Sequence, residues 1–253
     1  MGIYNFAFAF LAAVAAGFIN AIAGGGTLIS FPVLIAIGIP PIAANITNTI
    51  ALCPGYFGGV FAQRKDFLTQ KKRLWKILPV SITGGIAGGL ILLNSSEKSF
   101  DTLIPFLILL ATILLAFQTT LKKWIEARLE KSLHLKSNNF LMLILIFLAA
   151  IYGGYFGAGL GVILLAILGL VIDDSLTKLN ALKQAISLSI NIAAAIYFSF
   201  SGKVEWLIVA VMLFGSVSGG ILGGQLAGKI KPEILRWTIV IIGVAVAVIY
   251  FTK

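Results

Sequence analysis

Amide side chains and a lysine inside long apolar segments are the residues of this sequence best suited to binding chemistry. Asn45 and Asn48 are three positions apart and share one face of a helix. Lys183 and Asn191 are eight positions apart and lie on nearly the same face. Ionisable groups at membrane depth usually face a cavity. A lysine beside amide donors in such a cavity suits the binding of an oxyanion. There are two structural alternatives. The Lys183 side chain can snorkel to the membrane surface, and the amides can serve only to hold helices together.

Three consecutive glycines, Gly24, Gly25 and Gly26, interrupt the first apolar segment. Thr27 follows them as the predicted N-cap of a half-helix. Irregular backbone inside a bilayer is tolerated only where it is buried in protein or lines a cavity. The exposed N–H groups and the positive end of the helix dipole at this break would face an anion.

Gly159 and Gly161 predict a second break of the same kind. The motifs "GGIAGG", residues 84–89, and "GGILGG", residues 219–224, have i, i+4 spacing and predict close helix packing instead. The candidate substrate-binding residues are therefore Gly24, Gly25, Gly26, Thr27, Asn45, Thr47, Asn48, Gly159, Gly161, Lys183, Gln184 and Asn191.

The elements that must position these residues are transmembrane helices. The 253 residues are 59% hydrophobic, with a mean hydropathy of +1.05 and only 11% charged residues, against about 25% in soluble domains. Several apolar stretches are long enough to span roughly 30 Å of hydrocarbon. We expect an all-α polytopic membrane protein. The net charge of +10 then reflects loops that orient the chain, not a nucleic-acid surface.

The chain contains an internal repeat with an offset of 135 residues, because "SITGGIAGG" at 81–89 returns as "SVSGGILGG" at 216–224. A match of several landmarks at one offset without a gap indicates two related halves. The same offset pairs Gly24 with Gly159, Gly26 with Gly161, Asn45 with Asn180, and Asn48 with Lys183.

We expect two membrane repeats, 1–121 and 137–253, joined by a charged cytoplasmic linker, 122–136. Each repeat is predicted to hold a glycine-broken re-entrant or hairpin segment followed by three transmembrane helices. The predicted segments are 5–22 with 27–37, 42–62, 76–93 and 103–121, and then 140–157 with 161–172, 177–200, 206–228 and 234–251.

The distribution of Lys and Arg favours inverted over parallel repeats. If each broken segment returns to the side it entered, 16 of the 19 basic residues fall on the cytoplasmic side; if it crosses once, the best arrangement puts 13 there. We therefore expect a multi-pass protein of the cell membrane with both termini outside the cytoplasm. The loops that would be cytoplasmic are 64–76, 122–139, 173–183 and 229–236.

Acid–base and metal chemistry have few candidates in this sequence. All nine Asp and Glu residues lie in or beside predicted loops. Cys53 is the only cysteine, and His134, the only histidine, lies in a basic loop, where we expect a solvated surface position. We therefore expect no enzyme, no disulfide, no metal site and no cofactor.

Residues 17–55, "GFINAIAGGGTLISFPVL…ANITNTIALCPG", resemble the N-terminal signature of the TauE/SafE sulfite exporter family, also called the toluene sulfonate uptake permease family. "GGYFGAGLG", residues 153–161, and "LKQAISLSINIAAAIYF", residues 182–198, resemble that family's second signature. The resemblance implies transport of small anions such as sulfite, thiosulfate or sulfonates. The chain departs from the family pattern at Asn20, where an acidic or hydroxyl residue is common, and at Leu160, where glycine is usual. The residues to which the resemblance points are Gly24, Gly25, Gly26, Asn45, Thr47, Asn48, Lys183 and Asn191.

We therefore expect a permease that moves sulfite, or a related sulfur oxyanion or organosulfonate, by alternating access at a site between the repeats. Export is favoured because a negative-inside potential drives anions outward. The alternatives are a channel-like anion pathway, an importer coupled to H⁺ or Na⁺, and a non-transporting membrane scaffold. The expected partners are the small anionic substrate and the lipid bilayer, with no nucleic acid; a homo-oligomer is left open.

Overall fold

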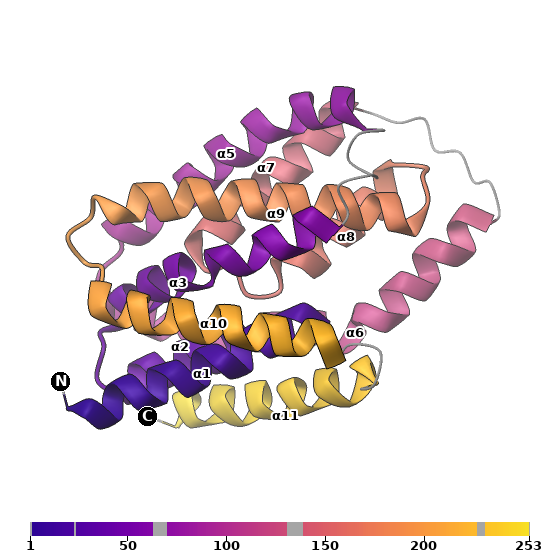
Figure 1. Ribbon diagram of the computed structural model, residues 1–253. Helices are drawn as coiled ribbons and strands as arrows, with labels where there is room; N and C mark the ends of the chain where they lie inside the picture. Colours follow the sequence, from indigo (N-terminus) through magenta and orange to yellow (C-terminus); the bar gives the residue numbers. More distant parts are fainter. Residues whose placement is uncertain (1, 23, 63–69, 131–138, 227–230, 253) are drawn as a thin grey trace.

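The computed structural model describes residues 2–22, 24–62, 70–130, 139–226 and 231–252, and within these ranges the chain is helical, without strands (Figure 1). His134 and residues 64–69 of the first predicted cytoplasmic loop lie outside the described residues. The helices are α1 (Ile3–Ile22), α2 (Thr27–Ala36), α3 (Pro41–Ala62), α5 (Lys71–Asn94), α6 (Glu97–Glu130), α7 (Asn139–Tyr155), α8 (Leu160–Val171), α9 (Leu176–Ser199), α10 (Trp206–Leu226) and α11 (Pro232–Phe251).

Six of the described helices are long and apolar enough to cross a membrane: α1, α5, α6, α9, α10 and α11. This confirms the prediction of an all-α, multi-pass membrane protein. The helices that follow the two glycine breaks are much shorter, because α2 has 10 residues and α8 has 12. At about 1.5 Å per residue each is shorter than the roughly 30 Å hydrocarbon core.

Two helices differ from their predicted bounds by more than two residues. α5 begins at Lys71, not at 76, and α6 continues to Glu130, past its predicted end at 121. The added residues of α6, "LKKWIEARLE" from 121 to 130, are mostly strong helix formers, so the helix propagates into the charged linker. α6 therefore extends beyond the apolar segment that the hydropathy pattern marks.

Helices of the two predicted halves interdigitate. α1 packs along α10 and α7 along α5, and these are the most extensive helix pairs of the described structure (Figure 1). α3 packs against both α9 and α10, α5 against α9, and α6 against α11. The central helices α3 and α9 are thus surrounded by elements from both halves.

Glycines form the seams between these helix pairs, as the i, i+4 motifs predict. A Cβ on Gly88 of α5 would overlap the Ile151 carbonyl of α7. In the other seam, a Cβ on Gly219 of α10 would overlap the Val14 carbonyl of α1. Because the obstacle is backbone in each case, these glycines are required for close helix approach, and the packing prediction is confirmed.

The described ends of the chain lie on one side of the bundle, together with the α9–α10 connection (Figure 1). The beginnings of α5, α9 and α11 and the end of α6 lie on the opposite side (Figure 1). These opposite-side segments carry most of the described basic residues: Lys71, Lys72, Arg73, Lys76, Lys122, Lys123, Arg128, Lys178 and Lys231.

Asp174 ties together helix ends on this basic side. Its carboxylate oxygens lie 3.2 Å from an Arg73 guanidinium nitrogen on α5 and 3.1 Å from the Lys178 ammonium on α9. Burial alone would raise the pKa of Asp174, but hydrogen bonds from Lys178, the Ser175 N–H and Arg73 outweigh it and hold the pKa below its usual 3.8. The ionised carboxylate therefore stabilises the α5–α9 junction.

Stability is expected to decline in acid as Asp174 is protonated. A carboxyl with a depressed folded-state pKa contributes stability above its unfolded pKa, and this contribution is lost as the pH falls from 3.8 through the folded value. The ion pairs are partly exposed, so the loss is at most about 1 kcal/mol. Thermal unfolding of detergent-solubilised protein checks this: Asp174→Asn should be less stable at neutral pH and less sensitive to acid. The exposed Glu126→Gln control on α6 should keep the wild-type profile.

Candidate functional site

The first glycine break connects α1 to α2 through a turn that only glycine adopts easily. Gly24 and Gly25 have φ angles of 82° and 93°, in the left-handed region. The Asn20 side-chain oxygen accepts a hydrogen bond of 2.8 Å from the Gly26 N–H. Asn20 thus fixes the end of α1 against the beginning of α2.

The prediction that Thr27 caps α2 is wrong. Gly26 occupies the N-cap position, with φ −55° and ψ −29°, and Thr27 is the first helical residue. Because Gly26 already has helical dihedrals, the helix begins one residue earlier in the turn than an N-cap threonine would allow. Asn20 instead accepts a hydrogen bond from the N–H of the N-cap residue, the group that the N3 side chain binds in a capping box.

The second break connects α7 to α8 and is stabilised by a different hydrogen bond. The Tyr152 hydroxyl donates a 2.6 Å hydrogen bond to the Ala158 carbonyl across the turn. Gly157 and Gly159 have φ angles of 78° and 76°. The N–H of Gly161, in the first turn of α8, has no hydrogen-bond partner among the described residues. The N-terminus of α8 therefore presents a donor at the positive end of its dipole.

The two breaks meet on the same turn of α6. A Cβ on Gly25 would overlap the Leu115 side chain, and a Cβ on Gly159 would lie 3.3 Å from the Ala111 Cα. Phe31 of α2 also packs edge-to-face on Phe156 of the second break, with ring centroids 5.3 Å apart. Segments far apart in the sequence are thus brought together at one level of the bundle.

Lys183 lies against the beginning of α8. A Cβ placed on Gly161 would be 3.7 Å from the Lys183 Cδ, so the absence of a side chain there makes room for the lysine stem. The Lys183 ammonium donates a 3.1 Å hydrogen bond to the Asn180 side-chain oxygen. Lys122 of α6 is near enough to interact electrostatically with Lys183. Two cations and a helix N-terminus therefore make this region electropositive.

Asn48 has the corresponding position in the first half. Its side-chain oxygen accepts a 2.5 Å hydrogen bond from the Ser30 hydroxyl, and Ser30 also contacts the Gly26 carbonyl at 3.2 Å. Asn48 thus lies beside the first turn of α2, as Lys183 lies beside the first turn of α8. The offset of 135 residues pairs the same two side chains and the same two glycines.

Asn45 joins α3 to the second break. Its amide nitrogen donates a 2.8 Å hydrogen bond to the Tyr155 carbonyl, at the end of α7. The side chain is 1% exposed, and its oxygen accepts no hydrogen bond from the described residues. Such buried, half-paired amides are rare in folded proteins and mark places of special function or strain.

The structure gives other partners to two of the predicted site residues. The Thr47 hydroxyl accepts a 3.2 Å hydrogen bond from the Glu205 N–H, just before α10. The Asn191 amide donates to the Ser187 carbonyl of its own helix at 2.8 Å. Gln184 is half-buried on α9 beside Lys183.

Sequence reasoning missed Ser30, Tyr152 and the capping role of Asn20. Ser30 is four residues after Gly26, a spacing that places its hydroxyl over the first turn of α2, so this signal was present in the sequence. An asparagine shortly before a glycine run is likewise a candidate acceptor for the N–H groups of the turn. Nothing in the spacing predicts that Tyr152 reaches across the second break.

Comparison with known proteins places these features in a family. A family model described as "Sulfite exporter TauE/SafE" matches residues 9–250. A probable membrane transporter protein of Haemophilus influenzae is 31% identical over 245 residues, covering 95% of this chain and 92% of that protein.

Two further relatives carry similar names. Probable membrane transporter protein ORF9 of a Sinorhizobium species is 27% identical, covering 96% of this chain and 90% of that protein. Probable membrane transporter protein YfcA of Escherichia coli K12 is 28% identical, covering 92% and 84%. No solved structure matches the chain.

Proposed function

Because this chain belongs to the TauE/SafE sulfite exporter family of membrane transporters, we propose that it is a permease for small anions. The substrate class is sulfite, or a related sulfur oxyanion or organosulfonate. The observation that carries this proposal is the placement of Lys183 against the N-terminus of α8, where Gly161 leaves an N–H group unpaired among the described residues. An ammonium beside a helix N-terminus attracts a compact oxyanion.

The substrate site of this proposal, called here the half-helix site, lies where the two glycine breaks meet α6. Lys183 and the Gly161 N–H supply positive charge, and Asn45 and Asn48 supply polar groups from α3. Gly24, Gly25, Gly26 and Gly159 shape the backbone around it. Thr27, Thr47, Gln184 and Asn191 line or support the same region in this proposal.

The proposal includes two inverted repeats, 1–121 and 137–253, with α2 and α8 as re-entrant half-helices. Helix contacts support it because they occur in matching pairs: α1 with α10 and α7 with α5, α3 with α10 and α9 with α5, and α2 with α11 and α8 with α6. A two-fold relation that exchanges α1 with α7, α2 with α8, α3 with α9, α5 with α10 and α6 with α11 would generate each pair. The grouping of basic residues on one side of the bundle supports a cytoplasmic location for that side, with both termini outside.

Transport would proceed by alternating access. Rocking of one repeat against the other, or local gating at the glycine breaks, would open the half-helix site to each side in turn. Export needs no coupling ion, because moving one negative charge out of a negative-inside cell gains about 2.3 kcal/mol per 100 mV.

Sulfite and thiosulfate flux in proteoliposomes, under an imposed potential of either sign, tests this function. For a univalent anion, 100 mV should support an accumulation ratio of about 50-fold, and reversing the potential should reverse the direction of flux. Saturation with substrate would identify a carrier, whereas non-saturating flux without countertransport would identify a channel. Absence of flux under both potentials, and after addition of pH or Na⁺ gradients, would contradict an anion permease.

A further inference from the structure

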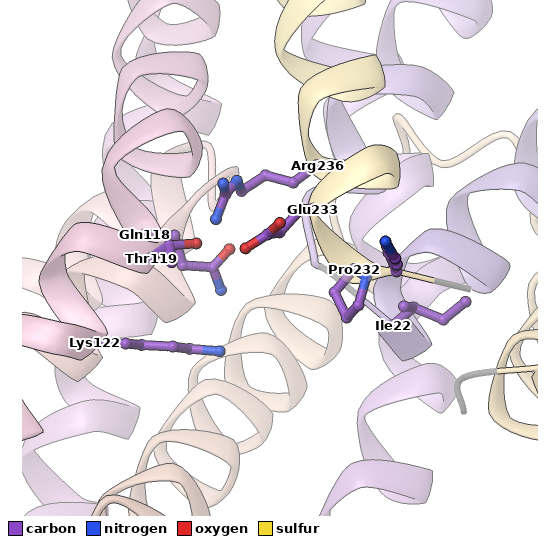
Figure 2. A pocket seen from close by; sticks show the side chains of 8 residues that line it. Ile22, Gln118, Thr119, Lys122, Pro232, Glu233 and Arg236 are labelled. Carbon is purple, nitrogen blue, oxygen red and sulfur yellow. The ribbon is translucent and has the colours of Figure 1, made fainter. Parts of the chain in front are cut away.

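A cavity lined by several charged side chains lies between the end of α6 and the beginning of α11. It has a volume of about 320 Å³ and also touches the end of α1 (Figure 2). Side chains from α6 and α11 point toward one another across it (Figure 2). Its lining residues are Ile22, Gln118, Thr119, Lys122, Lys231, Pro232, Glu233 and Arg236.

The charge of this cavity is positive. Lys122, Lys231 and Arg236 contribute three cations and Glu233 one carboxylate, which leaves a net charge of +2. None of the three cations has an ion-pair partner within 4.0 Å among the described residues. Glu233 lies in the first turn of α11, where the helix dipole favours an acidic residue, so its presence has a local explanation.

Arg236 is the most informative residue of the cavity. It is only 8% exposed, and its Nε has no hydrogen-bond partner among the described residues. Its guanidinium lies 5.7 Å from the centroid of the neighbouring Trp237 ring. Figure 2 shows the side chain extending from α11 toward Gln118 of α6. Burying an arginine with unpaired donors is costly unless an acceptor completes the site.

We propose that this cavity, the α6–α11 site, binds one oxyanion group of the phosphate or sulfate type. Arg236 and the two lysines would hold the charged oxygens, and the Gln118 amide would donate a further hydrogen bond. A doubly charged oxyanion matches the net charge of +2, and the guanidinium fork suits its geometry. The volume corresponds to on the order of ten water molecules, enough for a free anion with its first hydration shell or for a lipid headgroup.

The α6–α11 site is separate from the half-helix site but near it along one helix. Gln118 and Thr119 are one turn beyond Leu115, which covers the first glycine break. Lys122, one further turn along, interacts electrostatically with Lys183. An anion held at the α6–α11 site would therefore lie on the basic side of the bundle, next to the half-helix site. The proposal holds whatever substrate the half-helix site carries.

Sulfate binding to purified protein tests the free-anion source. Calorimetric titration at constant ionic strength would use Lys183→Ala as the parent, so that the half-helix site does not contribute. Arg236→Gln should weaken sulfate binding about tenfold or more, and Lys231→Gln about threefold. Glu233→Gln should tighten it about threefold, because the repelling carboxylate is removed. Lys76→Gln, an exposed cation on the same side but outside the cavity, should leave binding unchanged.

Retention of lipid tests the headgroup source. The same variants would be incubated with phosphatidylglycerol or phosphatidylcholine in detergent, and bound lipid counted by native mass spectrometry. Selective retention of phosphatidylglycerol that is lost in Lys231→Gln and Arg236→Gln, but kept in Lys76→Gln, would assign the site to a lipid phosphate. Lys231→Gln decides the question if Arg236→Gln does not fold, because Lys231 is exposed at the rim. The proposal would be overturned if the cavity variants changed neither sulfate binding nor phosphatidylglycerol binding.

Discussion

Replacing Lys183 by alanine is expected to abolish anion transport while leaving the fold intact. Lys183 is the eighth residue of α9, counting from Leu176, so its Cα lies about 10 Å from the start of the helix. Loss of a charged partner from a desolvated anion site costs about 2 kcal/mol or more, which corresponds to at least about 30-fold in affinity. Sulfite and thiosulfate flux in proteoliposomes measures the effect directly.

The fold should tolerate this change because, among the described residues, the lysine side chain makes no hydrogen bond to another helix. The Lys183 ammonium donates a hydrogen bond to the Asn180 side chain of the same helix. The Lys183 stem passes over Gly161, which has no side chain to pack against it. A normal thermal unfolding profile of Lys183→Ala would therefore accompany the loss of flux. Lys183→Arg should restore part of the flux, because the charge returns in a bulkier group that must fit over Gly161.

Lys98→Ala is the matched control for this prediction. Lys98 is an exposed lysine in the first turn of α6, on the side of the bundle away from the basic helix ends. Its removal changes the net charge of the protein by the same amount as Lys183→Ala. Equal, near-wild-type flux in both variants would remove Lys183 from the site and leave snorkelling as its role.

The transmembrane helices and the glycine breaks could be predicted because their signals are local. Apolar length marks the spans, and three glycines in a row mark a turn that other residues would strain. The extension of α6 through residues 122–130 differs from the prediction because a charged stretch marks the end of the apolar segment but not of the helix: Leu, Lys, Ala, Arg and Glu favour helix there.

The convergence of the two breaks on Ala111–Leu115 could not be predicted from spacing. It depends on how α6 passes between elements of both halves, which is a property of packing and not of local pattern. The acceptor for the Gly26 N–H is a similar case: Asn20 reaches it only because the turn folds back onto α1. The α6–α11 site needs the same tertiary information, since Lys122 belongs to the predicted linker and Arg236 to the second predicted repeat.

Residues related by the offset of 135 make corresponding contacts in the two halves. Asn48 and Lys183 occupy equivalent positions beside the first turns of α2 and α8, but one is neutral and the other cationic. In the proposed mechanism the second half thus supplies most of the binding charge, and the first half supplies hydrogen bonds. A site with this asymmetry would hold an anion off-centre, closer to α8 than to α2.

Replacing Gly219 by alanine is expected to destabilise the protein strongly, whereas Gly224→Ala on the same helix should be neutral or slightly stabilising. A Cβ at Gly219 would overlap the Val14 carbonyl of α1, whereas a Cβ at Gly224 would have no neighbour within 4 Å in the described part of the chain. The overlap is with backbone, so α1 and α10 must move apart along their whole contact. Overpacking of this kind costs about 1–3 kcal/mol, and alanine otherwise favours helix over glycine by about 1 kcal/mol.

Thermal unfolding of the two purified variants in one detergent separates these effects, since both change the same residue type in α10. Gly219→Ala should also reduce transport, because α1 carries Asn20 and leads directly into the first break. A shift of α1 would pull the Gly26 N–H away from its acceptor and disturb the N-terminus of α2. Equal stability of Gly219→Ala and Gly224→Ala would show that α1 and α10 can move apart at little cost in stability. The breaks would then be positioned by α6, by the Phe31–Phe156 contact and by the hydrogen bonds at Asn20, Asn45 and Tyr152.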